Sequence, residues 1–236
     1  MSFMQTVPAQ EKALDYLREQ ICRRVQEKLI VCGHSKGGNL AVYSAANCSE
    51  WMQDRITAVY NNDGPGFLFK PGSADGYRRI ADRIHLILPE NSLVGILLEQ
   101  VGNYKVVSSS AAGANQHDGM TWQVYGTEFP AVKSLTSSSF KTRQTLHSRL
   151  YAMNENQRRG LISGLFDVAR KAQTFTLTDM YANRGKITRI LMDRLKNMDA
   201  VQKDEMLRLV RLLVMGQGVE NGRSLSVRTH KSSENP

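Results

Sequence analysis

The residues Gly33-His34-Ser35-Lys36-Gly37 form the pattern G-x-S-x-G, which can carry a nucleophilic serine. The pattern gains meaning when it follows a strand and opens a helix. The short apolar run Leu29–Cys32 precedes it, and a helical pattern from Leu40 to Ala45 follows it. Glycines at 33, 37 and 38 would remove steric clashes in a sharp turn that lifts Ser35 Oγ above the sheet. The sequence therefore predicts a serine that attacks a carbonyl carbon.

The surroundings of this serine add two expected roles and one competing interpretation. The backbone N–H of Lys36 would lie at the start of the following helix and would donate to an oxyanion. His34 is expected to support the turn. A glycine-rich turn between a strand and a helix can instead bind phosphate, but neither G-x-x-x-x-G-K-[ST] nor G-x-G-x-x-G is present here. The nucleophile interpretation is therefore favoured.

A nucleophilic serine needs a base and an acid that orients it, and in this fold class the order along the chain is serine, then aspartate or glutamate, then histidine. Four histidines follow Ser35 in the sequence. His85 lies inside an apolar strand pattern, His147 in a basic helical segment, and His230 in the polar tail. His117 follows a predicted strand in a loop of small residues, which is where a base would be presented. We therefore predict that His117 is the base.

The acid that orients this histidine is predicted from the ends of strands, because the site of a parallel sheet lies at its carboxyl edge. Asp63 ends the strand after the nucleophile helix, in a turn rich in glycine and proline, and is the first choice. Glu90, after the next strand, is the reserve acid. Asp118 adjoins His117 in sequence and is a poor orienter, since immediate neighbours usually point in different directions. An ordinary turn aspartate is the alternative interpretation of Asp63.

The remaining pattern predicts an α/β fold with a mainly parallel sheet and flanking helices. The domain assignment is a partial α/β-hydrolase core at 1–127, a helical region at 128–215 and a disordered tail at 216–236. Two or three helices are expected between about 142 and 216. Helices are also predicted at 8–27, 77–83 and 93–100, and strands at 29–32, 56–60, 84–88, 104–108 and 122–125.

Charge and cysteine content narrow the class further. Residues 1–127 hold 12 Lys and Arg and 12 Asp and Glu, whereas residues 128–236 hold 19 and 10 and so supply the whole net charge of +9. The basic residues are scattered over helices, which argues against nucleic-acid binding and leaves a membrane surface open. Three cysteines are expected to be reduced and mostly buried. The N-terminus lacks a signal-peptide pattern, so the expected location is cytoplasmic.

The longer run Gly33-His34-Ser35-Lys36-Gly37-Gly38-Asn39-Leu40-Ala41 resembles an uncharacterised bacterial family of lipase-like α/β-hydrolases, a domain of unknown function. The resemblance covers about residues 5–180, and the wider group looks like class 3 lipases and esterases. It implies a triad of Ser35, Asp63 and His117. Further stretches that carry it are Val7–Gln10, Asn62–Phe67, Pro89–Gly95 and Gln116–Asp118 with Trp122.

One departure from that family concerns the residues before the nucleophile. Only 34 residues precede Ser35, which is room for one helix and one strand, so the domain is expected to be truncated at its N-terminus. The strand at 29–32 would then form a sheet edge, and the second oxyanion donor of such enzymes would be missing.

Together these features predict a serine hydrolase that acts on a small-molecule or lipid ester without metal or organic cofactor. The rival interpretation is a catalytically inactive, hydrolase-like interaction module with a basic helical half.

Overall fold

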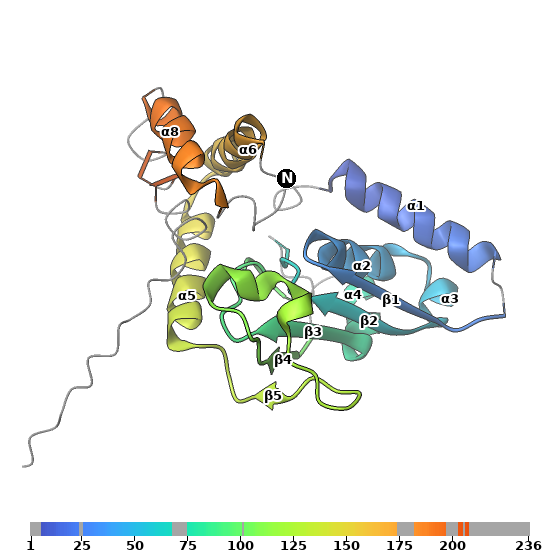
Figure 1. Cartoon of the computed structure of the whole chain (residues 1–236). Helices are drawn as coiled ribbons and strands as arrows, with labels where there is room; N and C mark the ends of the chain where they lie inside the picture. The colour runs from blue at the N-terminus through green and yellow to red at the C-terminus, as the bar shows by residue number, and fades with distance from the viewer. Residues whose placement is uncertain are drawn as a thin grey trace, which may run out of the picture.

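A computed structural model describes residues 6–23, 26–67, 75–100, 102–173, 182–196, 203–204 and 206–207. A central sheet is covered on one face by helices, and a group of further helices follows it (Figure 1). The elements are α1 (Pro8–Arg23), β1 (Leu29–His34), α2 (Lys36–Asn47), α3 (Glu50–Gln53), β2 (Ile56–Asn62), α4 (Asp75–Ile80), η2 (Ala81–Arg83), β3 (Ile84–Pro89), β4 (Tyr104–Val107), η3 (Gly113–His117), η4 (Gly119–Thr121), β5 (Ala131–Val132), α5 (Ser137–Ala152), α6 (Glu155–Ala172) and α8 (Arg184–Leu195).

The strands lie in the order β1-β2-β3-β4-β5, with β1 to β4 parallel and β5 antiparallel to β4. The α/β class predicted from the alternating pattern is therefore confirmed. Parallel strands bring their carboxyl ends to one edge of the sheet, so the residues after β1, β2 and β3 share that edge. Strand β1 lies at the end of the sheet, as expected, and Ile30 on it is 63% exposed.

The two faces of the sheet are covered differently. On one face, α2 packs against β1 and β2 and contacts α4, and α1 packs on α2. Their core includes Ile21, Ala45, Val59 and Ile80. On the other face, Ile87 and Val107 are covered by Trp122. There the sheet is covered by the segment between β4 and β5, which holds the short 3-10 helices η3 and η4, and not by an α-helix of the described chain.

Two predicted elements differ from the structure. Residues 93–100 form turns and not a helix, because their backbone groups bond across to residues 66 and 67 instead of to the next turn: Gly66 N–H donates to Leu97 O, and Phe67 and Glu99 exchange two hydrogen bonds. Residues 122–125 make only isolated bridges and no strand. The chain turns at residues 125–128, and the segment after the turn, β5, pairs with β4 instead.

The helical region at 128–215 is described only in part. Helices α6 and α8 pack together around Val168, Ile187 and Leu191. The expected disordered tail at 216–236 lies outside the described residues, as does most of the stretch from 197 to 215 at the end of the predicted helical region. The assignment of domain boundaries stays a prediction. Among the described residues, no helix combines the length and apolar character that crossing a membrane requires.

The cysteine prediction is partly wrong. All three thiols are free, as expected, but only Cys48 is buried, while Cys22 and Cys32 are exposed. Cys32 is exposed because it lies on β1, on the same face as the exposed Ile30, where no helix of the described chain covers the strand.

Helix α5 is tied to the segment between β3 and β4 by a hydrogen bond to a carboxylate, and this contact should respond to pH. His147 Nε2 on α5 lies 2.9 Å from Glu99 Oε1, and this hydrogen bond holds the pKa of Glu99 below its ordinary value. A carboxyl group whose pKa is lowered by folding stabilises the fold above its ordinary pKa of about 4.3. That stabilisation is lost as the pH falls through the pKa of the folded state.

We therefore expect Glu99→Gln to lower the midpoint of thermal unfolding near neutral pH and to have no effect once the pH is below the folded pKa of Glu99. Circular dichroism melts across this pH range measure the difference. Glu128→Gln removes an exposed carboxylate and is the matched control. A Glu99→Gln effect that is the same at every pH would contradict the assignment.

Candidate active site

Ser35 sits in a sharp turn between β1 and α2. Its φ is 55° and its ψ is −128°, a conformation that is uncommon for a residue with a side chain. The turn is held because Ser35 N–H donates to Asn62 O at 2.9 Å and Gly38 N–H donates to Ser35 O at 2.9 Å. Such strain persists only where the surrounding structure enforces it, and it is frequent at catalytic residues. The predicted strand, turn and helix around Ser35 are all present.

The glycines of the turn are not equivalent. A Cβ on Gly33 would lie 2.2 Å from the backbone of Gly37, and one on Gly38 would lie 2.0 Å from Asn61 Oδ1. A Cβ on Gly37 would meet nothing within 4 Å. The expectation that all three glycines remove clashes is therefore wrong for Gly37, which faces open space.

The Asp63 side chain is fully buried directly after β2, with a φ of 49°. Its Oδ2 accepts a hydrogen bond from His117 Nδ1 at 2.7 Å. Its Oδ1 accepts from Ser92 Oγ and from Gly95 N–H, the latter at 3.0 Å. Carboxylates are tolerated in the interior when donors surround them in this way.

His117 ends the short helix η3, and 12% of its side chain is exposed. Its partner through Nδ1 is Asp63, so Nε2 is the ring nitrogen left for a proton transfer. His34, the residue before Ser35, reaches the backbone O of His117 with Nε2 at 2.6 Å, and the two rings lie 4.6 Å apart. His117 and the turn at Ser35 are thus side by side, although no hydrogen bond joins Ser35 Oγ to His117 among the described residues.

The other candidate residues take different positions. Glu90 forms backbone hydrogen bonds with Val107 and Thr136, and no interaction joins its carboxylate to His117 in the described part of the chain. Asp118 accepts from Met120 N–H and caps η4. His85 stacks on Tyr60, and His147 pairs with Glu99. His230 lies outside the described residues.

Lys36 begins α2, where the first backbone N–H groups have no partner within the helix and can face an oxyanion. Its side chain folds back so that Nζ donates to the fully buried Asn39 Oδ1 at 3.2 Å. Burial lowers the pKa of Lys36 to about 8. Asn39 also donates to Pro65 O and Gly66 O, so it connects α2 with the loop after Asp63. Sequence reasoning did not single out Asn39, Ser92 or Gly95.

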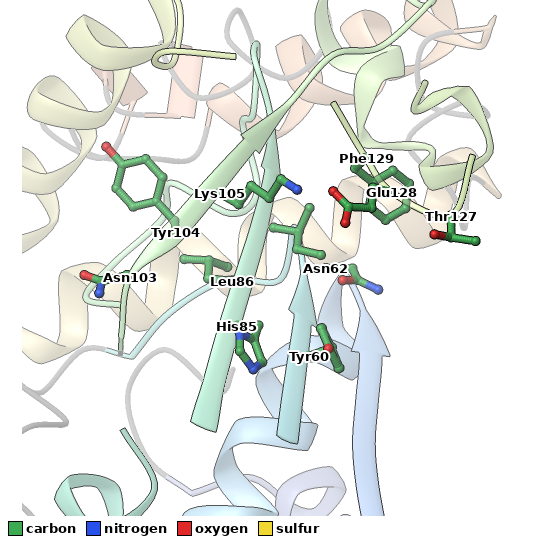
Figure 2. Close-up of a pocket in the computed structure, with 11 residues that line it drawn as sticks. Tyr60, Asn62, His85, Leu86, Asn103, Tyr104, Lys105, Thr127, Glu128 and Phe129 are labelled. Atoms are coloured by element: carbon green, nitrogen blue, oxygen red, sulfur yellow. The ribbon is translucent and has the colours of Figure 1, made fainter. Parts of the chain in front are cut away.

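A cavity of about 520 Å³ lies on the sheet face that the helices leave open. Tyr60 and His85 project beside each other from β2 and β3, and Phe129 lies across from them (Figure 2). Asn62 lines the same cavity, and its buried Oδ1 has no hydrogen-bond partner among the described residues. Because Asn62 adjoins Asp63 in the chain and pairs in register with His34, this cavity lies close to the candidate site.

The fold and these contacts define a chain of the α/β class in which a strained serine lies beside a histidine–aspartate pair. Residues 1–167 match the sequence model of the Mbeg1-like family, and the chain belongs to that family. Neither the curated proteins nor the solved structures contain a match to it. The described residues contain no cluster of three or more His, Cys, Asp or Glu that could hold a metal ion.

The unequal glycines of the turn lead to a stability prediction. We expect Gly33→Ala to destabilise the protein by about 1–3 kcal/mol or more, because its methyl group would overlap backbone atoms. Gly37→Ala has free space and replaces glycine in a helix, so it should be neutral or stabilising by up to about 1 kcal/mol. Urea unfolding of the two variants beside the wild type measures this. Equal destabilisation by both substitutions would contradict the geometry.

The lowered pKa of Lys36 predicts an unusually reactive amine. At a pH of about 8.5 most of its ammonium should have lost its proton, whereas an exposed lysine with a pKa of about 10.4 should remain almost fully charged. We expect limiting amounts of an amine-acylating reagent to modify Lys36 before the exposed Lys12. Peptide mapping by mass spectrometry gives the ratio. Faster modification of Lys12 at this pH would argue against a desolvated Lys36.

Proposed function

We propose that this protein is a serine hydrolase of the lipase or esterase type, that is, a carboxylic ester hydrolase. The observation that carries the proposal is the 2.7 Å hydrogen bond between His117 Nδ1 and the buried Asp63, formed beside a strained Ser35. These three residue types, in the chain order serine, aspartate, histidine, match the arrangement of α/β-hydrolases. The nucleophile run resembles a family of lipase-like α/β-hydrolases whose wider group looks like class 3 lipases and esterases, and this resemblance supports the same reaction.

In the proposed reaction, His117 Nε2 takes the proton of Ser35 as Oγ attacks the ester carbonyl. Asp63 holds the imidazole in the tautomer with its proton on Nδ1 and stabilises the imidazolium that forms. The Lys36 N–H, at the start of α2, donates to the oxyanion. His117 then protonates the leaving alcohol, and water, activated by the same imidazole, releases the acid from Ser35. In free enzymes the serine–histidine contact is often longer than in the substrate complex.

The substrate we propose is a small-molecule or lipid ester. The cavity of about 520 Å³ beside the site falls in the range of small-molecule pockets, about 300–1,000 Å³. The rings of Tyr60, His85 and Phe129 suit an apolar group, and the free acceptor on Asn62 suits a hydroxyl or amide donor of the bound molecule.

One observation favours a second candidate function, an interaction module without catalysis. Strand β1 is a sheet edge whose Ile30 is 63% exposed, and a groove along it is lined by Tyr16 and Leu17 of α1 and by Leu40 of α2. An exposed edge of this kind is a site where another chain can add a strand.

A fluorophosphonate probe tests the first function, because it labels only serines that a base has activated. We expect the wild type to be labelled and Ser35→Ala to remain unlabelled. His117→Ala should slow labelling by about 1,000-fold or more, and Asp63→Asn by a similar order, because both remove parts of one proton-transfer unit.

Ser148→Ala, which removes an exposed hydroxyl on α5, is the control and should be labelled like the wild type. Labelling that persists in Ser35→Ala, or a folded wild type without any labelling, would overturn the hydrolase function. The second outcome would favour the interaction module.

A further inference from the structure

Both oxygens of the Asp63 carboxylate are engaged, and this fixes the direction in which it faces His117. Gly95 N–H and Ser92 Oγ donate to Oδ1, which leaves Oδ2 for His117 Nδ1. The terminal torsion of an aspartate is otherwise broad. Ser92 is 1% exposed, so its hydroxyl has no access to solvent as an alternative partner. Orientation of the acid thus depends on a residue 29 positions away in the chain.

Ser92 is itself held by helix α5. Its backbone O accepts a hydrogen bond of 2.7 Å from Ser139 Oγ, and both residues are buried. Ser139 lies in the first turn of α5, where its N–H donates to the capping Thr136 Oγ1 at 3.2 Å. The cap and the Ser139 hydroxyl therefore join the start of α5 to the residue that holds the acid.

The neighbouring Asn91 connects the start of α5 to the residue before His117. Asn91 N–H donates to Gln116 Oε1 at 2.8 Å, and Gln116 directly precedes His117. Thr136 Oγ1 donates to Asn91 Oδ1 at 2.6 Å, and Thr136 N–H donates to Glu90 O at 3.0 Å. The segment 90–92 thus lies between the acid, the base and the N-terminal end of α5.

We propose that Ser92 is a positioning residue for the Asp63–His117 pair, and that the first turn of α5 fixes segment 90–92 in the conformation this requires. The proposal rests on the hydrolase function proposed above for the role of the pair. Ser92 does not touch the reacting atoms. It acts through Asp63, since loss of its hydroxyl would leave the buried Oδ1 with one donor and allow the carboxylate to turn away from His117.

The expected effect is on the rate of the chemical step. A hydrogen bond to a charged, buried group is strong enough for its removal to slow the reaction by about 10- to 100-fold. We expect Ser92→Ala to lower kcat by this factor with little change in KM, because Ser92 is buried behind Asp63. Ser139→Ala should act in the same direction and less strongly, because it moves Ser92 without removing its hydroxyl. Ser148→Ala, on the exposed side of the same helix, should change nothing.

Two measurements on the full chain separate this proposal from the proposed function. The first is the reaction rate, followed both by fluorophosphonate labelling and by hydrolysis of a p-nitrophenyl ester. The second is the proton resonance of His117 Nδ1–H in NMR spectra, assigned by its loss in His117→Ala, which reports the bond to Asp63 without any turnover. We expect a downfield signal in the wild type and in Ser148→Ala, and its loss in Ser92→Ala.

Retention of both the wild-type rate and the resonance in Ser92→Ala would overturn the positioning role. A wild type without labelling would remove the hydrolase function, while loss of the resonance in Ser92→Ala would still support the structural part of the proposal. If Ser92→Ala does not fold, Ser139→Ala decides: an unchanged resonance and rate there would overturn the role of α5, and a weakened resonance with a slower rate would support it.

Discussion

The Asp63 carboxylate carries no exposed surface, and the arrangement of the site follows from that constraint. A charge in the interior is costly unless hydrogen-bond donors replace the water that it has lost. Here the donors come from Ser92, Gly95 and His117, which belong to two different loops. Each loop must reach the same point at the carboxyl edge of the sheet, so the hydrogen bonds that satisfy this buried carboxylate also fix the position of His117.

The close approach around this carboxylate explains residues that otherwise look like ordinary turn formers. A Cβ on Gly95 would lie 2.4 Å from Asp63 Oδ1, and one on Gly64 would lie 2.4 Å from Ser35 O. Asn61 accepts from Gly64 N–H at 2.8 Å, while Asn39 bonds Pro65 and Gly66. The loop after β2 is thus packed against the nucleophile helix, which couples the position of Asp63 to that of Ser35.

The sequence was sufficient to predict the features that depend on local order. The strand, turn and helix around Ser35 are contiguous, and Asp63 and His117 follow strands whose patterns are short and apolar. Both Asp63 and Glu90 follow a strand, so the sequence alone separates them only weakly. The hydrogen bond to His117 distinguishes Asp63 from Glu90, and it joins residues 54 positions apart. Ser92 and Ser139 could not be recognised, because a serine in a loop or a first helical turn looks the same whether or not a buried carboxylate depends on it.

The errors have a similar origin in tertiary contacts. Residues 93–100 carry an apolar pattern compatible with a helix, but their backbone hydrogen bonds go to residues 66 and 67 and to Asp63. Gly37 and Gly38 are adjacent glycines that the sequence does not distinguish. Only the close approach of Asn61 shows that Gly38, and not Gly37, must lack a side chain. Burial of Cys32 could not be judged without knowing which face of β1 is covered.

The change in charge near residue 127 predicts a neutral α/β part and a basic helical part, yet hydrogen bonds join the two parts. Thr136, Ser139 and His147 all contact the α/β part, and the first two bond directly to Asn91 and Ser92, which contact Gln116 and Asp63. Helix α5 is therefore more than a solvated basic surface, because its Ser139 hydroxyl is buried and donates to Ser92 O. Wherever a domain boundary is drawn, the first turn of α5 is therefore joined by hydrogen bonds to Asn91 and Ser92, and Ser92 in turn contacts the Asp63 carboxylate.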